Sequence, residues 1–129
     1  MWSFGCILIE LYTGIPIFPG ESETEQLALI MQTFGKPPLH VLENAERKDK
    51  FFQPGTNEPL NVFEEPGRGY RLPDSRPLVE VIGDQSETFF DFICQCLDWD
   101  PAQRITPLQA LQHPWILEGL PKRVLIHHQ

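Results

Sequence analysis

The fold is decided first by the opening stretch MWSFGCILIELYTG, residues 1–14. Apolar side chains fall on nearly every side of a helix built from it, which is typical of a helix buried on all faces. Gly14 stands where a C-terminal cap is expected, and Pro16 prevents the helix from continuing. Because 129 residues can hardly bury such a helix all round, the stretch predicts a larger surrounding protein.

The second decisive stretch is LDWDPAQRIT, residues 97–106, which is followed by ALQHPW. Thr106 is predicted to cap a helix that begins at Pro107, since threonine is a favoured cap and proline a favoured first helical residue. Gln109 completes the capping box. We expect Leu108 and Leu111 to face inward and Pro114 to end this helix.

Three further helices are predicted between these stretches. Ser22 and Glu25 have capping-box spacing, and Gly35 stops the helix that they begin. A short helix is predicted at about residues 38–45, and another from Asp84 or Ser86. The residues predicted to face inward are Leu27, Ile30, Met31 and Phe34 in the first, Leu39 and Leu42 in the second, and Phe89, Phe90, Phe92, Ile93, Cys96 and Leu97 in the third.

Residues 53–83 differ from the rest because they contain five prolines and several glycines. This composition predicts an irregular insert with little regular structure. Val79, Val81 and Ile82 are expected to anchor its end. The whole pattern predicts an all-α fold of four to five helices, with the domain at residues 1–121 and a tail at 122–129.

The charge and cysteine content of the chain argue against several classes of function. Ten basic against eighteen acidic residues give a net charge of −8, which argues against a nucleic-acid partner and against binding to anionic lipid. Glu10 interrupts the apolar opening and no cation precedes Lys36, so we expect neither a membrane helix nor a signal peptide. Three cysteines without a disulfide framework suit a reducing, intracellular compartment, cytoplasmic or nuclear.

The two decisive stretches together resemble a eukaryotic protein kinase domain. MWSFGCILIEL is similar to the segment that opens the long buried helix of the large lobe, and LDWDPAQRIT with ALQHPW is similar to the last kinase subdomain. Within that family, GE at 20–21, QLA at 26–28 and FGKPP at 34–38 resemble the dual-specificity tyrosine-regulated kinases, although the insert is shorter than usual there. The resemblance implies a partial C-terminal lobe with a proline-rich insert.

The catalytic motifs of the kinase family are absent from this sequence. There is no G-x-G-x-x-G, H-R-D, D-F-G or A-P-E; Asp91-Phe92-Ile93 lacks the glycine and lies in a predicted amphipathic helix. We therefore assign no catalytic, cofactor-binding or metal-binding residue, and interpret the chain as an inactive fragment. The resemblance implies that the complete enzyme uses ATP and Mg²⁺ to phosphorylate protein hydroxyls, and that the partners are protein substrates and the rest of the kinase domain.

Glu10 is the one charge in the opening helix, and a lone carboxylate there needs a partner or must face a cleft. In several kinases that select basic substrates, a glutamate at this position pairs with a substrate arginine. The resemblance thus makes Glu10 a substrate-recognition candidate. An internal hydrogen bond or salt bridge is the alternative.

Arg104 resembles the kinase arginine that pairs with the glutamate of A-P-E, a role that suits the planar guanidinium. That glutamate is missing here, so we expect Arg104 to lack its partner or to be satisfied by Asp98 or Asp100. Trp2, Trp99 and Trp115 are predicted to be packing anchors. The Cys94 and Cys96 thiols would point about 200° apart on a helix and could not chelate a metal together. His113 is expected to have a structural hydrogen-bonding role.

Two other functions fit the sequence less well. One is a non-catalytic interaction module that holds a partner through the helix containing Met31 and Phe34, together with the proline-rich insert. The other is an unrelated helical structural domain, which would fold cooperatively on its own.

Overall fold

The computed structural model describes residues 1–60, 64–65, 69–70, 72–83 and 86–121. The chain divides into two compact units, which are described separately. The first combines residues 1–16 with 82–129, and the second comprises residues 17–81. No helix in the described part of the chain is both long and apolar enough to cross a lipid bilayer.

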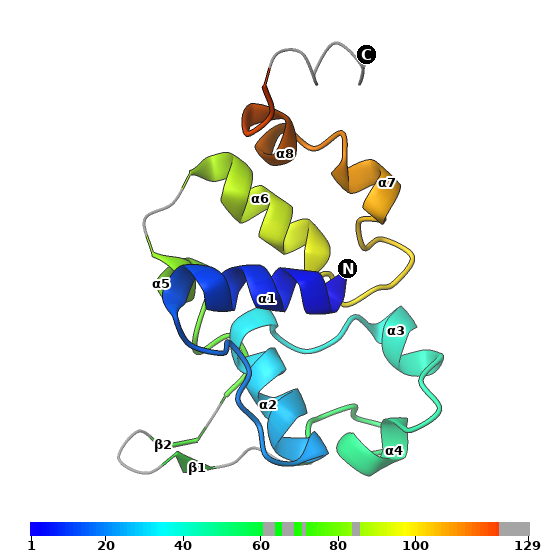
Figure 1. The fold of residues 1–129 in the computed structure, drawn as a ribbon. Coiled ribbons are helices and arrows are strands. Elements are labelled where there is room, and N and C mark those ends of the chain that lie inside the picture. The colour runs from blue at the N-terminus through cyan, green and yellow to red at the C-terminus, as the bar shows by residue number, and fades with distance from the viewer. Residues whose placement is uncertain (61–63, 66–68, 71, 84–85, 122–129) are drawn as a thin grey trace. The chain divides into compact units, whose positions relative to one another are not determined.

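The first unit is helical. Helices α1 (Trp2–Thr13) and α6 (Glu87–Cys96) pack across each other, and α8 (Pro114–Glu118) packs on α6, with α7 (Pro107–Ala110) just before it in the chain (Figure 1). The apolar side of α6 supplies most of the core. Its buried members are Phe89, Phe92, Ile93 and Cys96, joined by Leu97 just after the helix and by Ile9, Ile105 and Ala110.

Helix α1 has the predicted boundaries, but it is not buried on all sides within this chain. Gly14 adopts a left-handed conformation with φ of 83°, and its N–H donates to the Glu10 carbonyl as a cap. Only Gly5 and Ile9 are buried. Phe4, Ile7 and Leu11 form an apolar stripe on one side of α1, with exposed fractions of 42, 53 and 78%. The sequence predicted that the helix as a whole needs a larger surrounding protein, and this stripe is the side that the described residues leave exposed.

Helix α6 begins as its capping residue predicts. The Ser86 hydroxyl accepts a hydrogen bond from the Phe89 N–H, while the other proposed start, Asp84, lies outside the described residues. Five of its six predicted inward residues are buried, and Phe90 is half-buried.

The capping box at Thr106 and Gln109 is confirmed, with Pro107 as the first residue of α7. The predicted inward residues of this helix are wrong, because Leu108 is 76% exposed and Leu111 is also exposed. A helix of four residues buries a single position, and here that position is Ala110. Pro114 does follow α7, but it also begins α8, for which proline is equally suitable as a first residue.

The second unit contains α2 (Glu23–Phe34), α3 (Leu39–Glu43), α4 (Lys48–Phe51) and the start of α5 (Leu78–Ile82). Strands β1 (Glu64–Glu65) and β2 (Gly69–Tyr70) pair antiparallel within the proline-rich insert. This pair is only two residues long on each side, so the predicted all-α fold is confirmed. Helix α4 was not predicted, because its sequence KDKF has no apolar period.

The cap of α2 is confirmed, since the Ser22 hydroxyl accepts from the Glu25 N–H. Its inward face is rotated from the prediction: Ala28, Leu29 and Met31 are buried, whereas Leu27, Ile30 and Phe34 are half-buried. Leu42 of α3 is buried as predicted, but Leu39 is exposed. At the end of the insert Leu78 and Ile82 are buried, Val81 is half-buried, and Val79 is exposed, contrary to prediction.

Candidate functional site

The loop between α6 and α7 carries the most distinctive sequence of the first unit, and local hydrogen bonds hold it. The Asp98 carboxylate accepts from the Asp100 N–H at 2.9 Å, and the Asp100 carboxylate accepts from the Ala102 N–H at 2.9 Å. The Ile105 N–H donates to the Gln95 carbonyl at 3.0 Å, which ties the end of the loop to α6. These bonds give Arg104 a defined position.

Arg104 contacts a backbone carbonyl and an aromatic ring. Its Nε donates to the Asp98 carbonyl at 3.0 Å, and its guanidinium carbon lies 5.3 Å from the centre of the Trp2 ring. Attraction between a cation and an indole face stabilises such an arrangement. The predicted acidic neighbour Asp98 therefore binds Arg104, but through its main-chain carbonyl. The contact with Trp2 was not predicted, because the two residues are 102 positions apart in the sequence.

The three tryptophans lie at two places in the first unit. The Trp2 and Trp99 rings are 6.3 Å apart. Trp115 lies 5.0 Å from the rings of both Phe89 and Phe92. The Trp99 Nε1 is buried and has no acceptor among the described residues, which leaves one polar atom unsatisfied at the Trp2 end.

His113 links α6 to α8. The side chain of His113 is buried. Its Nε2 lies 2.7 Å from a carboxylate oxygen of Asp91, and its Nδ1 accepts a hydrogen bond from the Trp115 N–H at 3.0 Å. Because Nδ1 accepts, the tautomer must carry its hydrogen on Nε2, which then donates to Asp91. The Gln95 amide donates to the same carboxylate oxygen at 2.7 Å. The hydrogen-bonding role predicted for His113 is thus found at the N-terminus of α8.

Glu10 is exposed on α1. Its carboxylate has no hydrogen bond or ion pair with any residue that the structure describes, so the internal partner considered as an alternative is not found there. Two positions along a helix correspond to about 200° of rotation, which places Glu10 on the side of α1 away from Leu8.

A shallow apolar groove of about 330 Å³ lies on the same unit. Helix α1 contributes Leu8, Leu11 and Tyr12, α8 contributes Trp115, and the start of α6 contributes Ser86 and Phe89. The rings of Tyr12 and Phe89 are 5.8 Å apart. The groove could not be predicted from the sequence because its residues come from three separate segments. The pattern of each segment alone predicts only residues of a hydrophobic core.

Among the residues that the structure describes, no three potential metal ligands come together. The three cysteines are free; burial raises the pKa of Cys6 and Cys94, and raises that of Cys96 to about 11. A buried thiol of this kind is a poor metal ligand and a poor nucleophile.

Comparison with known proteins identifies the family. The model of the protein kinase domain matches residues 1–116. The human dual specificity tyrosine-phosphorylation-regulated kinase 4 is 47% identical over 116 residues, which are 90% of this chain and 22% of that protein. The Drosophila melanogaster dual specificity tyrosine-phosphorylation-regulated kinase 2 is 46% identical over 90% of this chain and 16% of its own length.

A third relative, the probable serine/threonine-protein kinase dyrk2 of Dictyostelium discoideum, is 44% identical over 92% of this chain and 13% of that protein. The chain thus spans less than a quarter of the length of these curated relatives. Their names agree with the branch suggested by the sequence motifs, and the family match rules out an unrelated helical domain. The chain belongs to the protein kinase domain family, in the branch of the dual-specificity tyrosine-phosphorylation-regulated kinases.

Proposed function

We propose that this chain serves as the C-terminal part of the large lobe of a dual-specificity or serine/threonine protein kinase. The complete enzyme transfers the γ-phosphoryl group of ATP to protein hydroxyls, and the chain alone is inactive. The observation that carries the proposal is the kinase-domain match over residues 1–116, in a chain with an exposed apolar stripe on α1. An apolar helix face of this kind favours a covering partner.

The chemistry of the complete enzyme requires a phosphate-binding loop, a lysine, a catalytic aspartate and metal-binding carboxylates. Because these motifs are absent from this sequence, we assign ATP and Mg²⁺ to the rest of the kinase domain. In this proposal residues 1–121 belong to the domain, residues 53–83 form its insert and residues 122–129 follow it. The three free thiols support an intracellular location.

We assign substrate recognition in the complete enzyme to Glu10. Its exposed carboxylate has no partner among the described residues, and a substrate arginine would supply two N–H donors to it. We assign a structural ion pair to Arg104. The Asp98 carbonyl accepts from Nε alone, so the terminal nitrogens of Arg104 remain able to donate hydrogen bonds to a carboxylate from the rest of the domain. We also assign Trp2, Trp99 and Trp115 as packing anchors, because their rings contact one another or neighbouring phenylalanine rings.

The experiment that tests the function is a chimera. The matching segment of the human kinase 4 relative is replaced by residues 1–116 of this chain, and transfer of radiolabelled phosphate to a protein substrate is measured. We expect transfer by the chimera and none above a buffer blank by the 129-residue chain. A chimera that is folded but inactive would favour a non-catalytic interaction module. Transfer by the chain alone would contradict the inactive-fragment proposal.

Glu10 is tested in the same chimera. The Glu10→Gln variant should lose activity on arginine-bearing peptides by about tenfold, the loss of one charge-assisted pair, and retain activity on peptides without arginine. The matched control is Glu21→Gln, an exposed glutamate of the second unit, which should leave both unchanged. Equal loss on all peptides would contradict the role in recognition.

A further inference from the structure

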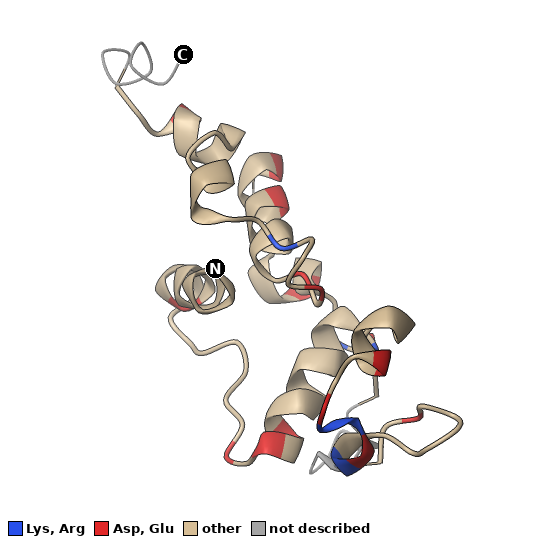
Figure 2. Ribbon diagram, turned by 90° about the vertical axis from the view of Figure 1, so that its right-hand side faces the viewer, with Lys and Arg blue, Asp and Glu red and all other residues tan. Residues whose placement is uncertain are grey.

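The loop between α6 and α7 carries two aspartates, Asp98 and Asp100, close in sequence to Arg104. Figure 2, in which acidic residues are red and basic residues blue, shows both colours on this loop. Arg104 nevertheless forms no ion pair with any residue that the structure describes. Its Nε donates to the main-chain carbonyl of Asp98 at 3.0 Å, and its guanidinium lies over the Trp2 ring. The two carboxylates therefore have a different use in this loop.

Each carboxylate accepts a hydrogen bond from the backbone two residues ahead. The Asp98 carboxylate accepts from the Asp100 N–H and the Asp100 carboxylate from the Ala102 N–H, both at 2.9 Å. This arrangement is an Asx-turn, which the short side chains of aspartate and asparagine both form. The Asp100 carbonyl also accepts from the N–H groups of Gln103 and Arg104 at 3.0 and 2.9 Å. The turns bend the chain so that the side chain of Arg104 returns to the Asp98 carbonyl.

These turns leave the guanidinium of Arg104 available to another carboxylate. A carboxylate of the same loop that paired with it would neutralise its charge and occupy its terminal N–H groups. Because the Asp98 carboxylate accepts from the backbone instead, the terminal nitrogens of Arg104 can still donate to the rest of the kinase domain. A side chain that is oriented before its partner arrives loses less conformational entropy when the pair forms.

We propose that Asp98 and Asp100 are positioning residues of the complete kinase. They orient Arg104 for its partner carboxylate through the geometry of their turns, and not through their negative charge. These roles require the structural ion pair that we proposed for Arg104, and they add the residues that orient it. Phosphate transfer depends on both aspartates indirectly, because that pair joins this chain to the part of the domain to which we assign ATP.

Two substitutions of Asp98 separate geometry from charge. Asparagine places an oxygen at the same distance from the backbone and keeps the turn, but it carries no charge. Glutamate keeps the charge, but its longer side chain does not favour the turn and gives the loop a carboxylate that can pair with the guanidinium. Under the proposal Asp98→Asn resembles the unmodified chain, whereas Asp98→Glu resembles Asp98→Ala. Retained activity in Asp98→Glu with loss in Asp98→Asn would overturn the proposal in favour of a role for the charge.

The variants are compared in the kinase chimera through the kinetics of phosphate transfer to a protein substrate. We expect kcat/KM of Asp98→Asn to stay within about twofold of the unmodified chimera, and that of Asp98→Ala and Asp98→Glu to fall by about tenfold. The same order is expected for the three matching variants of Asp100. Gln103→Ala, at an exposed side chain of the same loop, is the control and should leave kcat/KM unchanged. Equal activity of all the Asp98 variants would overturn the proposal.

A second measurement does not depend on kinase activity. Nitrogen-15 NMR of the 129-residue chain follows hydrogen exchange of the Arg104 Nε–H, whose signal is assigned by its loss in Arg104→Lys. The bond to the Asp98 carbonyl slows this exchange, so we expect slow exchange in Asp98→Asn and exchange at least about tenfold faster in Asp98→Ala and Asp98→Glu. Equal exchange in all three would overturn the proposal. An unmodified chimera that transfers no phosphate would instead contradict the proposed function, while exchange in the chain still decides whether the turns orient Arg104.

Discussion

Gly5 of α1 and Cys96 of α6 lie so close that a β-carbon built on Gly5 would come within 2.8 Å of the Cys96 Cβ and 3.1 Å of the Leu97 side chain. A Cβ atom cannot rotate away from such a contact, because it is fixed to its backbone. Glycine at position 5 therefore sets the distance at which the two main helices of the first unit cross.

We predict that Gly5→Ala separates these helices and destabilises the fold by about 1–3 kcal/mol, the usual cost of overpacking. The urea midpoint, followed by circular dichroism, measures the loss. Gly119→Ala is the control, since its new methyl group would lie 3.6 Å from the nearest atom, the Ile116 carbonyl. Equal shifts for the two variants would contradict the close crossing.

His113→Ala should remove both the cap of α8 and the bond to Asp91, at a cost of about 1–3 kcal/mol. Trp115 should become more exposed, which a red shift of tryptophan fluorescence would report. His113→Asn can still cap the helix and should fall between the wild type and His113→Ala. Gln112→Ala, at the exposed residue next to His113, is the control. A loss of stability of similar size in that variant would refute the role of His113.

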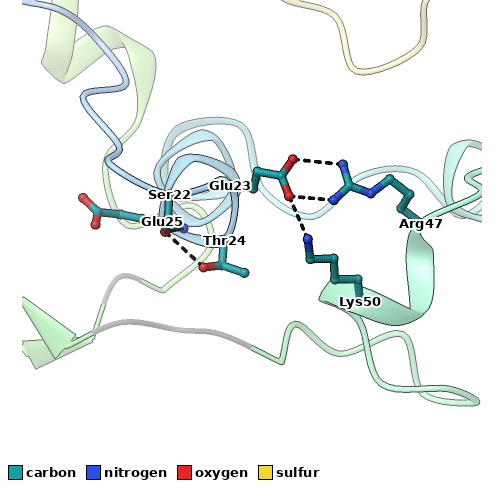
Figure 3. A network of polar contacts seen from close by, with 6 residues as sticks. All are labelled: Ser22, Glu23, Thr24, Glu25, Arg47 and Lys50. Carbon is teal, nitrogen blue, oxygen red and sulfur yellow. Dashed lines mark hydrogen bonds and ion pairs between the residues drawn. The ribbon is translucent and has the colours of Figure 1, made fainter.

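Glu23 lies within reach of two cations of the second unit, as Figure 3 shows. Its carboxylate accepts from the Arg47 guanidinium at 3.0 and 2.6 Å and from the Lys50 ammonium at 2.8 Å. The hydrogen bond from Arg47 is the largest of the causes that lower the Glu23 pKa from 4.5 to about 2. The pairs therefore keep the carboxylate ionised in the folded chain.

A depressed carboxylate pKa stabilises the folded state above the unfolded pKa, and this contribution is lost as pH falls. For Glu23 the window runs from about pH 4.5 down to about pH 2. Carbon-13 NMR of the glutamate carboxyls should follow this titration. Arg47→Gln should move the pKa of Glu23 up toward 4.5, and Lys36→Gln, which removes the separate pair with Glu58, should not. A Glu23 pKa near 4.5 in the unmodified chain would contradict the observed pairs.

The thiols should differ in reactivity. Burial raises the pKa of Cys96 to about 11, and its side chain is fully buried, whereas Cys94 is partly exposed. At pH 8 iodoacetamide should modify Cys96 at least about tenfold more slowly than Cys94, because the thiolate is the reactive form. Both cysteines lie in one tryptic peptide, so fragment-ion mass spectrometry of that peptide measures the two rates separately. In denaturing urea the rates should converge, and equal rates in the folded chain would show that Cys96 is accessible.

Helix starts could be predicted from the sequence because a cap is a local arrangement. Ser22, Ser86 and Thr106 each bind a backbone N–H three residues ahead, and that geometry depends on neighbouring residues alone. The inward face of a short helix could not be predicted in the same way. Leu108 is exposed although it is apolar, because α7 has one turn and the core beneath it has room for Ala110.

The contacts of the candidate site were less predictable, because they join distant parts of the chain. Trp2 beneath Arg104 and Asp91 beside His113 follow from the packing of α1, α6 and α8, which no local pattern encodes. Pro114 shows a related limit: proline both follows one helix and begins the next, so its type alone does not distinguish the two. The family resemblance was predictable because it depends on residue identity within two short stretches.

The exposed stripe of Phe4, Ile7 and Leu11 affects how this polypeptide would be handled by the chaperones and proteases of a cell. Exposed apolar surface of this kind is what chaperones bind and what leads newly made chains to aggregate. Synthesised by itself, the chain would be held by chaperones and turned over by proteases, so that its abundance would depend on the supply of a covering partner. Quality control would then couple the amount of this chain to the amount of that partner.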